Sequence, residues 1–549
     1  MTWWQEAVIY QIYPRSFKDS NGDGVGDIPG IIEKLDYLND GTPGSLGVDA
    51  IWLSPIYPSP MFDFGYDISD YSSIDPEFGT MNDFRRLLKE AHKRGIRIIM
   101  DLVINHTSHQ HPWFLESRSS RDNPKRDWYI WKDPAPGGGE PNNWLGTFGG
   151  KGWEWDAATE QYYYHSFLVE QPDLNWRNPE VKAAVFQMIR EWLELGVDGF
   201  RLDVINLLIK DDQFRDNPVD LFKLARPFDR QRHEYDRDRP ELYEILSDFR
   251  ALLEEFDGDR ASVGEIMVED NEKARRVATF TGRDDYLHMA FNFAYFFSKW
   301  DADNFRHRIV EWEAALAESN GGWPTYTLSN HDFVRHISRY SSPGDTQERA
   351  RVALLMLLTL RGTPFLYYGE EIGMYEEPVA RWEMKDPLGL RYWPLHPGRD
   401  GCRRPMAWSD GPKGGFTGGN PWLPVSRRYR TENVATHARD PESLLSYYKR
   451  AIWYRRGDDV LRKGEQLVLQ NTPDGVLAYI REYKTERRLV AHNFKGKSVK
   501  LPVLSLLSDA AHPGAGAKIA FSTHAEREGR TVDGEFELKG NEGVVIAVE

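Results

Sequence analysis

The chain has 549 residues, of which 40% are hydrophobic, and a formal net charge of −16. This length is sufficient for two or three domains with a large core. The negative charge argues against nucleic acid and anionic membrane surfaces as partners. Because no apolar run reaches transmembrane length, we expect a soluble protein.

The cellular compartment is indicated by two features. The single cysteine, Cys402, makes an internal disulfide impossible, which fits a reducing environment. The first residues, 1–7, lack the basic and apolar regions of a secretory signal. We therefore expect a cytoplasmic protein.

The first half of the chain alternates short apolar runs with helical patterns. Residues 8–13 and 48–55 are strand-like, and 81–94 have apolar residues at helical spacing before a terminal glycine. A buried strand is predicted at 96–103, and a helix that begins at Asn178 leads directly into a strand at 197–203. Further strands are expected at 261–265, 288–293, 325–329 and 365–368.

Eight strands in such an alternation predict a parallel sheet closed into a (β/α)8 TIM barrel. Residues 106–177 are too long for an ordinary loop, so we expect an inserted domain B after the third strand. The barrel, domain A, would then comprise 1–105 and 178–466. Short apolar runs in 467–549 predict a C-terminal antiparallel β-sandwich, domain C.

Four predicted strands end abruptly in charged residues. The strings are Asp101–His106, Gly199–Asp203, Val263–Glu265 and Leu328–Asp332. A parallel barrel collects the carboxyl ends of its strands at one face, where the chemistry takes place. These endings therefore predict one acidic pocket, of the type that cleaves glycosidic bonds.

The acidic residues suggest separate roles. We predict Asp203 as a carboxylate nucleophile, with Arg201 on the same side of the strand lowering its pKa. Glu265 is the candidate acid and base, and should be less well paired so that it holds a proton. Glu269 is an alternative acid. Asp332 is a third carboxylate for sugar hydroxyls, and His106 and His331 would donate hydrogen bonds to hydroxyls.

The four strings resemble those of the α-amylase superfamily, glycoside hydrolase family 13. A fifth string, Gln171–Asn175, is typical of its α-glucosidase and oligo-1,6-glucosidase branch. The resemblance covers essentially the whole chain and implies the barrel, domain B and a C-terminal β-domain. It also implies double displacement: Asp203 forms a β-glucosyl ester, Glu265 protonates the leaving oxygen and then activates water, and Asp332 stabilises the transition state.

The same resemblance implies a pocket for the nonreducing end of the substrate. Asp63 and Tyr66 would close it, and Arg399 would hydrogen-bond the terminal glucose, so cleavage should be exo. Phe148 and Phe167 would line the approach of the next sugar, although both also suit the core of domain B.

An acidic loop places oxygen ligands at every second residue, as hard cations prefer. Its residues are Asp19, Asn21, Asp23, Val25 and Asp27. The twelfth position is Gly30 and not glutamate, which rejects an EF-hand. Relatives hold Ca²⁺ or Mg²⁺ here, with Val25 ligating through its carbonyl, so we expect a structural cation and no organic cofactor. The alternative is a metal-free turn rich in glycine and aspartate.

The linkage is indicated by Val204, because valine at this position accompanies α-1,6 and related linkages in the resembled branch. Residues 137–144 and 226–230 look more like those of glucosidases with broad linkage tolerance. We therefore expect a retaining α-glucosidase acting on small α-glucosides such as isomaltose-type sugars, maltose and sucrose, with transglucosylation as a side activity. The protein would be a monomer or a homodimer.

Two rival functions remain. A sucrose isomerase or trehalose synthase-like glucosyl transferase uses the same scaffold, although residues 333–340 lack the charged cluster of isomaltulose-forming relatives. A non-catalytic binding protein is disfavoured because all three carboxylates are kept. The sequence contains no Gly-x-Ser-x-Gly string, which disfavours serine hydrolase chemistry.

Overall fold

The computed structural model describes residues 1–268, 273–282, 285–319, 321–508, 516–532 and 534–548. Eight parallel strands form a nearly closed barrel in the order β10-β11-β1-β2-β3-β7-β8-β9, which confirms the predicted fold class. The strands are β1 (Ile9–Ile12), β2 (Ala50–Leu53), β3 (Arg97–Leu102), β7 (Gly199–Leu202), β8 (Ala261–Gly264), β9 (Met289–Ala290), β10 (Thr325–Thr327) and β11 (Thr363–Tyr367).

The barrel is least regular between β9 and β10, which share no backbone ladder among the described residues. The Thr325 hydroxyl donates a 2.6 Å hydrogen bond to the Ala290 carbonyl and joins the two strands there. The strand predicted at 288–293 is only two residues long, because the Asn292 side chain accepts a hydrogen bond from the N–H of Tyr295 and starts α10 (Phe293–Phe296). A side-chain cap therefore replaces further strand pairing.

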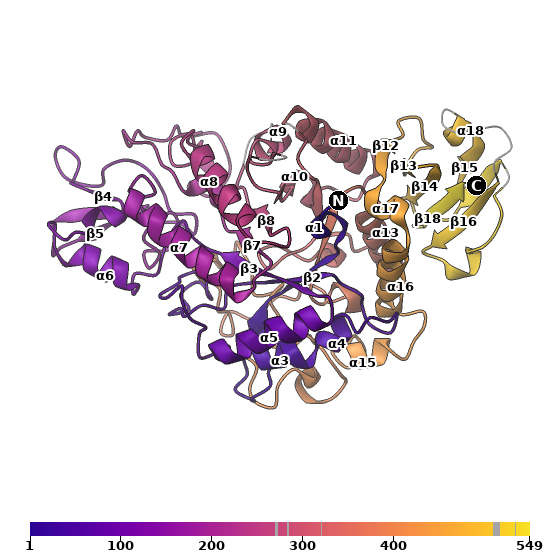
Figure 1. The fold of residues 1–549 in the computed structure, drawn as a ribbon, viewed down its shortest axis with the longest axis horizontal. Coiled ribbons are helices and arrows are strands. Elements are labelled where there is room, and N and C mark those ends of the chain that lie inside the picture. Colours follow the sequence, from indigo (N-terminus) through magenta and orange to yellow (C-terminus); the bar gives the residue numbers. More distant parts are fainter. Residues whose placement is uncertain (269–272, 283–284, 320, 509–515, 533, 549) are drawn as a thin grey trace.

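The helices between the strands begin and end at residues that cap them. Thr80 and Asp83 form a capping box at the start of α5 (Met81–Lys93), whose apolar side faces the core. Asn178 caps α7 (Pro179–Leu195), and Gly196 ends it with φ of 104°, a left-handed conformation that suits glycine. These two helices cover β2, β3 and β7 from outside (Figure 1).

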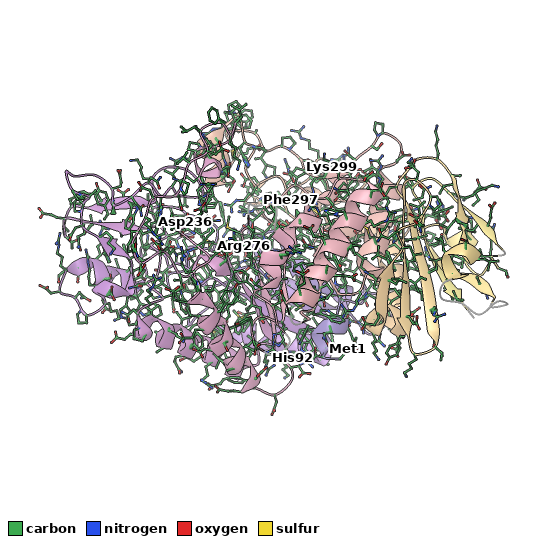
Figure 2. All side chains as sticks on the ribbon, turned by 90° about the horizontal axis from the view of Figure 1, so that it is seen from above. Met1, His92, Asp236, Arg276, Phe297 and Lys299 are labelled. Atoms are coloured by element: carbon green, nitrogen blue, oxygen red, sulfur yellow. The ribbon has the colours of Figure 1, made fainter. Side chains whose placement is uncertain are left out.

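The remaining helices have the following bounds: α1 (Trp3–Glu6), α2 (Pro14–Phe17), α3 (Ile28–Glu33), α4 (Leu35–Leu38), α8 (Leu242–Glu254), α9 (Lys273–Ala278), α11 (Ala302–Glu318), α12 (His336–Arg339), α13 (Thr346–Thr359), α14 (Pro387–Tyr392), α15 (Val434–His437), α16 (Leu444–Gly457) and α17 (Asp459–Lys463). Within the described part of the chain, no helix combines the length and the apolar character that crossing a bilayer requires. Side chains fill the space between these helices and the barrel (Figure 2).

Two smaller sheets lie at opposite ends of the molecule (Figure 1). The insertion after β3 carries α6 (Pro112–Ser119) and the antiparallel strands β4 (Trp131–Lys132), β5 (Trp153–Asp156) and β6 (Gln161–Tyr164). Beyond the barrel, an antiparallel sheet has the order β12-β13-β14-β18-β16. Its strands are β12 (Glu465–Val468), β13 (Val476–Tyr483), β14 (Glu486–Asn493), β16 (Ala517–Ser522) and β18 (Gly543–Val548).

This C-terminal region has its own apolar cluster, which includes Val476, Ile480 and Leu538. A short ladder of β15 (Val499–Pro502) and β17 (Glu535–Leu538), with α18 (Val503–Ser508), completes it. The first strand begins at Glu465, two residues before the predicted boundary at 467. The exact domain limits stay a prediction.

Candidate active site

The carboxyl ends of three neighbouring barrel strands place acidic side chains together. Asp203 directly follows β7, and Glu265 directly follows β8. The N–H of Asp203 donates to the Leu102 carbonyl (3.0 Å), and the N–H of Glu265 donates to the Leu202 carbonyl (2.9 Å). These bonds extend the parallel ladder by one step, so both carboxylates stand at the same face of the barrel.

A buried guanidinium group binds three of the carboxylates. Arg201 donates from Nη1 to Asp101 Oδ1 (2.8 Å) and to Asp203 Oδ1 (2.7 Å), and from Nη2 to Glu265 Oε2 (2.5 Å). The expectation that Glu265 is less well paired was therefore wrong. Because β7 and β8 are adjacent, with Arg201 opposite Val263, the guanidinium reaches the ends of both strands.

Burial has a larger effect than the Arg201 cation on the pKa values of these carboxyl groups. Desolvation raises the pKa of Asp203 well above its usual range, and the opposing effect of Arg201 is smaller. The predicted lowering of this pKa by Arg201 was thus wrong in its net direction. Burial also raises the pKa of Glu265 and of Asp101. Three carboxylates compete for one buried cation, so the group retains protons more strongly than exposed carboxylates do.

Asp332 has a different electrostatic environment. Its Oδ1 accepts from Arg399 Nη1 (3.2 Å) and Arg403 Nη2 (2.9 Å), and its Oδ2 lies 3.3 Å from His331 Nε2. Burial by itself would raise the pKa of Asp332, but His331, Arg399 and Arg403 hold it well below its usual range. Asp332 is therefore ionised under conditions in which the Arg201 cluster still holds a proton.

One end of the site is closed by a second guanidinium. Arg399 donates to Asp63 Oδ1 (2.7 Å) and to Asp332, and its Nε donates to Asp386 Oδ1 (2.8 Å). Asp386 also caps α14 and is fully buried, and we did not predict it because it follows no strand-like run. Asp386 holds Arg399 in place, and the residues next to Arg399 in the sequence do not reveal this partner.

The wall beside Asp63 consists of Tyr66 and two histidines. The Tyr66 hydroxyl lies 2.6 Å from His331 Nε2 and donates to Asp101 Oδ2 (3.1 Å), while its ring stacks on His331 at 5.4 Å. His106 Nε2 lies 3.1 Å from the side-chain nitrogen of Gln171. Burial lowers the pKa of His106 and brings that of His331 to about 3, so both rings are neutral near pH 7.

These groups surround a cavity of about 270 Å³. Nine of the predicted site residues line it, and Arg201 and His331 support it from behind: the lining residues are Asp63, Tyr66, His106, Phe148, Phe167, Asp203, Glu265, Asp332 and Arg399. Glu269 lies outside the described residues. Further described residues line the cavity, and of these only Val204 had been given a role from the sequence: Thr147, Val204, Arg226, Ile266, Met267, Val268, Lys273, Phe293, Phe297, Phe333 and Leu388.

Five of these additional residues come within four residues of the end of a barrel strand, which is the signal that could have found them, and the other six do not. Ile266, Met267 and Val268 come after Glu265, and Phe333 follows Asp332. Val204 has φ of 37°, a left-handed conformation that is strained for a β-branched residue. In this conformation its N–H points to Glu265 Oε2 at 3.4 Å.

The predicted cation loop lies apart from this cavity, between α2 and α3. Asp19 accepts three hydrogen bonds of 2.6–2.9 Å from backbone N–H groups of the loop, and Asp27 accepts from Gly30 (2.6 Å) and caps α3. The N–H of Val25 donates to Asp23 (2.8 Å). Carboxylate, amide and carbonyl oxygens are the donors that calcium prefers. Among the described residues, however, no group of three or more His, Cys, Asp or Glu side chains is placed to hold a metal ion.

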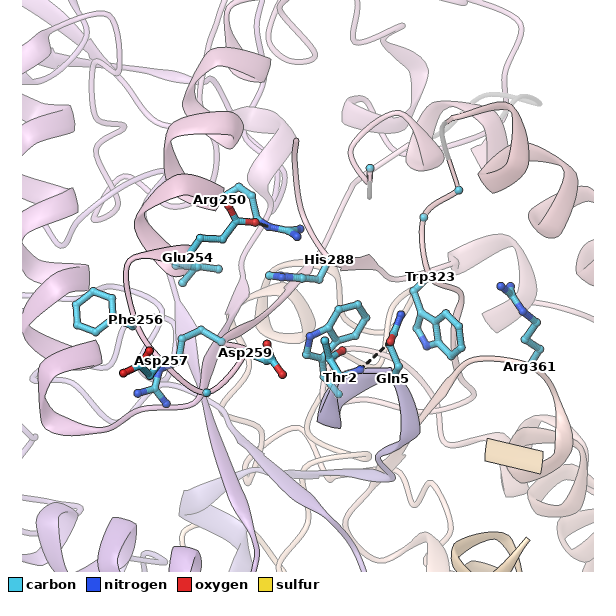
Figure 3. Close-up of a pocket in the computed structure, with 17 residues that line it drawn as sticks. Thr2, Gln5, Arg250, Glu254, Phe256, Asp257, Asp259, His288, Trp323 and Arg361 are labelled. Carbon is cyan, nitrogen blue, oxygen red and sulfur yellow. Dashed lines mark hydrogen bonds and ion pairs between the residues drawn. The ribbon is translucent and has the colours of Figure 1, made fainter. Parts of the chain in front are cut away.

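A larger cavity, of about 620 Å³, lies at the opposite, N-terminal end of the barrel strands (Figure 3). It is lined by α1, by the end of α8 and by residues that precede β8, β9, β10 and β11, such as Arg260, His288, Trp323 and Arg361. None of the predicted catalytic residues lines it. The smaller cavity is therefore the candidate active site.

Comparison with known proteins agrees with this assignment. Residues 11–464 match the family model described as alpha amylase, catalytic domain. A probable alpha-glucosidase of Rhizobium meliloti (strain 1021) is 43% identical over 518 residues, 92% of each chain. An oligo-1,6-glucosidase of Parageobacillus thermoglucosidasius is 41% identical over 537 residues, again 92% of each.

The crystal structure of an alpha-glucosyl transfer enzyme, XgtA, superimposes with a TM-score of 0.91 at 42% identity and covers 100% of both chains. The family match spans more than half of the chain, and the likeness to these relatives extends over nearly all of it. The chain therefore belongs to the α-amylase family, glycoside hydrolase family 13.

Proposed function

We propose that this protein is a retaining, exo-acting α-glucosidase. The observation that carries this proposal is the Arg201 cluster, in which Asp203 and Glu265 share one guanidinium beside the ionised Asp332. Retaining glycosidases require two carboxyl groups about 5–5.5 Å apart, one as nucleophile and one as acid. A common guanidinium keeps the two carboxyl groups close and lets them hold one proton between them.

The reaction follows from these positions. The Asp203 carboxylate attacks the anomeric carbon and forms a glucosyl ester, while Glu265 gives its proton to the leaving oxygen. Glu265 then takes a proton from water as the water oxygen attacks the same carbon and releases Asp203. The Asp332 carboxylate is held ionised by Arg399 and Arg403, and it stabilises the positive charge that develops on the ring.

Exo action is supported by the closed end of the cavity. Arg399 binds Asp63 and Asp332, and Tyr66 and His106 line the same side. A terminal glucose fits against such an end, because its outer hydroxyls meet charged and neutral hydrogen-bonding groups. The interior of a longer chain has no exit there.

The proposed substrates are short α-glucosides, namely isomaltose-type sugars, maltose and sucrose. Val204 supports the α-1,6 part, since it is buried in a cluster with Phe148, Phe167 and Leu388 and lines the cavity that a leaving group would enter. The likeness to an oligo-1,6-glucosidase points the same way. A panel of glucose disaccharides followed by NMR tests the proposal: α-glucose should appear first, and isomaltose should be cleaved. Release of β-glucose, or activity confined to long starch, would refute it.

A glucosyl transferase or sucrose isomerase is the second candidate, supported by the likeness to an alpha-glucosyl transfer enzyme. Water and alcohols compete for the same glucosyl ester, so one site supports both outcomes. Product analysis with sucrose separates them: glucose and fructose indicate hydrolysis, and an isomeric disaccharide indicates isomerisation.

We make two secondary proposals, one on a bound metal ion and one on the cellular location and oligomeric state. We propose that Asp19, Asn21, Asp23, Asp27 and the Val25 carbonyl would hold Ca²⁺ or Mg²⁺, which would have to draw the acidic side chains together, since those of the described residues do not form such a group, and would take no part in the chemistry. A chelator should then lower the unfolding temperature, and restored Ca²⁺ should recover it. We further propose a cytoplasmic protein, monomeric or homodimeric, which cell fractionation and light scattering test.

A further inference from the structure

Gln11 lies behind the active-site cavity, at the end of the first barrel strand. Its side chain is 1% exposed and does not line the cavity. Its amide nitrogen lies 2.8 Å from Nδ1 of His331, whereas the other ring nitrogen of His331, Nε2, lies 3.3 Å from Asp332 Oδ2. Gln11 can therefore act on Asp332 only through the His331 ring, and it cannot touch the substrate.

The orientation of the Gln11 amide follows from its neighbours, since the nitrogen and oxygen of an amide are distinguished by the hydrogen bonds that each position allows. The nitrogen position contacts two possible acceptors, His331 Nδ1 and, at 3.2 Å, Ser54 Oγ. The oxygen position is buried and has no hydrogen-bond partner among the described residues. The reverse orientation would bury both N–H groups there without an acceptor, which is rarer in proteins than an unpaired carbonyl oxygen. The amide therefore donates to His331 Nδ1.

The contacts of His331 Nε2 require the same arrangement. The Tyr66 hydroxyl gives its single proton to Asp101 Oδ2, at 3.1 Å. The Tyr66 oxygen lies 2.6 Å from His331 Nε2, so it accepts a proton from that nitrogen. The Asp332 carboxylate is a second acceptor on this side of the ring. Two acceptors thus surround Nε2, which must carry the proton.

The ring itself is neutral and held in place. Burial lowers the pKa of His331 to about 3, so near pH 7 the ring carries one proton on its two nitrogens. The ring stacks with Tyr13 at 5.9 Å and with Tyr66 at 5.4 Å, and it meets the edge of Trp52 at 6.0 Å. These rings oppose a rotation that would exchange the nitrogens. A donor at Nδ1 and acceptors at Nε2 therefore select one tautomer from both sides.

We propose that Gln11 is a positioning residue that keeps the proton of His331 on Nε2. The opposite tautomer would turn the Nε2 lone pair toward the Asp332 carboxylate, and it would draw the Tyr66 hydroxyl proton away from Asp101. Asp332 would then face a lone pair and not a proton donor while positive charge develops on the sugar ring. The effect on catalysis rests on the proposed glucosidase function, whereas the position of the proton does not.

The position of the proton can be measured without substrate. In NMR spectra of protein with isotope-labelled histidine, Nδ1 of His331 should have the chemical shift of an unprotonated nitrogen that accepts a hydrogen bond. Nε2 should have the shift of a protonated nitrogen. The signals are assigned by their loss in His331→Asn. A protonated Nδ1 in the wild-type protein would overturn the inference.

Two substitutions separate the donor from its packing. Gln11→Met removes the donor and keeps a side chain of similar length, and we expect kcat for isomaltose to fall at least about fivefold with little change in KM. Gln11→Glu presents a carboxylate that only accepts, so Nδ1 should become protonated and kcat should fall at least about tenfold. Glutamate matches glutamine more closely in shape, so a role in packing alone predicts the reverse order. A smaller loss in Gln11→Glu than in Gln11→Met would overturn the inference.

Ser54→Ala is the control, because it removes the other acceptor of the same amide nitrogen and leaves the contact with His331 intact. Its tautomer should be unchanged and its kcat should stay within about twofold of the wild type. A loss as large as that of Gln11→Met would show that the effect does not pass through His331. If Gln11→Glu does not fold, the wild-type spectrum and Gln11→Met decide the question.

The outcomes also separate this inference from the proposed function. If no α-glucoside is hydrolysed but Nε2 carries the proton, the proposed function fails and the assignment of the tautomer stands. If isomaltose is hydrolysed with retention while Nδ1 carries the proton, only the inference on Gln11 fails.

Discussion

The two ends of the barrel contain cavities with opposite electrostatic organisation. At the N-terminal end, the larger cavity has three arginines that each pair with a separate carboxylate: Arg250 with Glu254 (2.6 Å), Arg260 with Asp198 (3.5 Å) and Arg361 with Glu465 (3.2 Å). At the C-terminal end, one arginine serves three carboxylates. The volume of a cavity therefore does not identify the active site in this protein. An excess of buried carboxylates over cations identifies it better.

The excess of carboxylates around Arg201 destabilises the folded protein through repulsion between like charges, which one-to-one ion pairs avoid. Asp101, Asp203 and Glu265 are buried around one cation, so like charges repel unless a proton is retained. Such an arrangement is expected where a proton must be held and then given up during a reaction. At the other end, among the residues that the structure describes, no cation is shared among several buried carboxylates, since Arg250 and Glu254 pair within α8 and Asp198 is itself bound by both Arg97 and Arg260, so no proton has to be retained there.

The largest effect should come from Asp203→Asn. The variant removes the nucleophile, and we expect kcat/KM for isomaltose to fall by at least about 10⁴-fold. The unfolding temperature should stay equal or rise, because Arg201 then serves two carboxylates and not three. Steady-state kinetics measure the loss of activity, and thermal unfolding measures the change in stability. If the Asp203→Asn variant cleaves isomaltose normally, the shared-cation cluster at the C-terminal end is not the catalytic site, and the comparison of the two ends fails.

Glu265→Gln should have the next largest effect, a loss of about 10²- to 10⁴-fold on isomaltose. Substrates with a good leaving group, such as p-nitrophenyl α-glucoside, should lose much less. Burial raises the pKa of Glu265, and the first step needs its protonated form, so wild-type activity should fall as pH rises through that pKa. Glutamine does not titrate, and a pH profile that keeps this alkaline limb in Glu265→Gln would assign the proton elsewhere.

Arg399→Lys tests the closed end of the active site. One ammonium group cannot reproduce the separate bonds from Arg399 to Asp63, Asp332 and Asp386. We expect kcat/KM to decrease about 10- to 100-fold, the range of one or two charge-assisted hydrogen bonds. Kinetics on isomaltose and on isomaltotriose measure this decrease, and wild-type values would show that Arg399 does not contribute to binding.

The smallest effect should come from His288 in the larger cavity (Figure 3). Burial lowers the pKa of His288 to about 3, so below pH 6.5 the unfolded chain binds the proton that the folded chain excludes. The contribution of His288 to the free energy of unfolding is therefore fully present above pH 6.5, and it is lost progressively as the pH falls toward 3. At pH 5 the loss is about 2 kcal/mol, or about 2 °C for a chain of this size.

His288→Gln should remove that loss, so its unfolding temperature should fall less than that of the wild type between pH 7 and pH 5. Activity on isomaltose should be unaffected. A large loss of kcat/KM in His288→Gln would mean that the two ends are coupled, and the comparison between them would then fail.

Sequence patterns by themselves determined the barrel, its acidic face and the limits of several helices. The strand runs that end in Asp203, Glu265 and Asp332 predict the barrel and its acidic face, since carboxyl ends of parallel strands meet at one edge. The caps Thr80 and Asn178 and the stop at Gly196 mark their helices, because capping depends on residues within one turn. These features are local or periodic and are therefore readable along the chain.

The tertiary structure alone decided the electrostatics of the site and the part of its lining that comes from segments away from the strand ends. Glu265 shares Arg201 with Asp203 because β7 and β8 are adjacent, and burial outweighs that cation in raising both pKa values. Asp386 and Phe297 approach the site from segments with no strand-end signal. A pKa depends on every charge and on the solvent within several ångströms in space, and most of those neighbours are distant in the sequence.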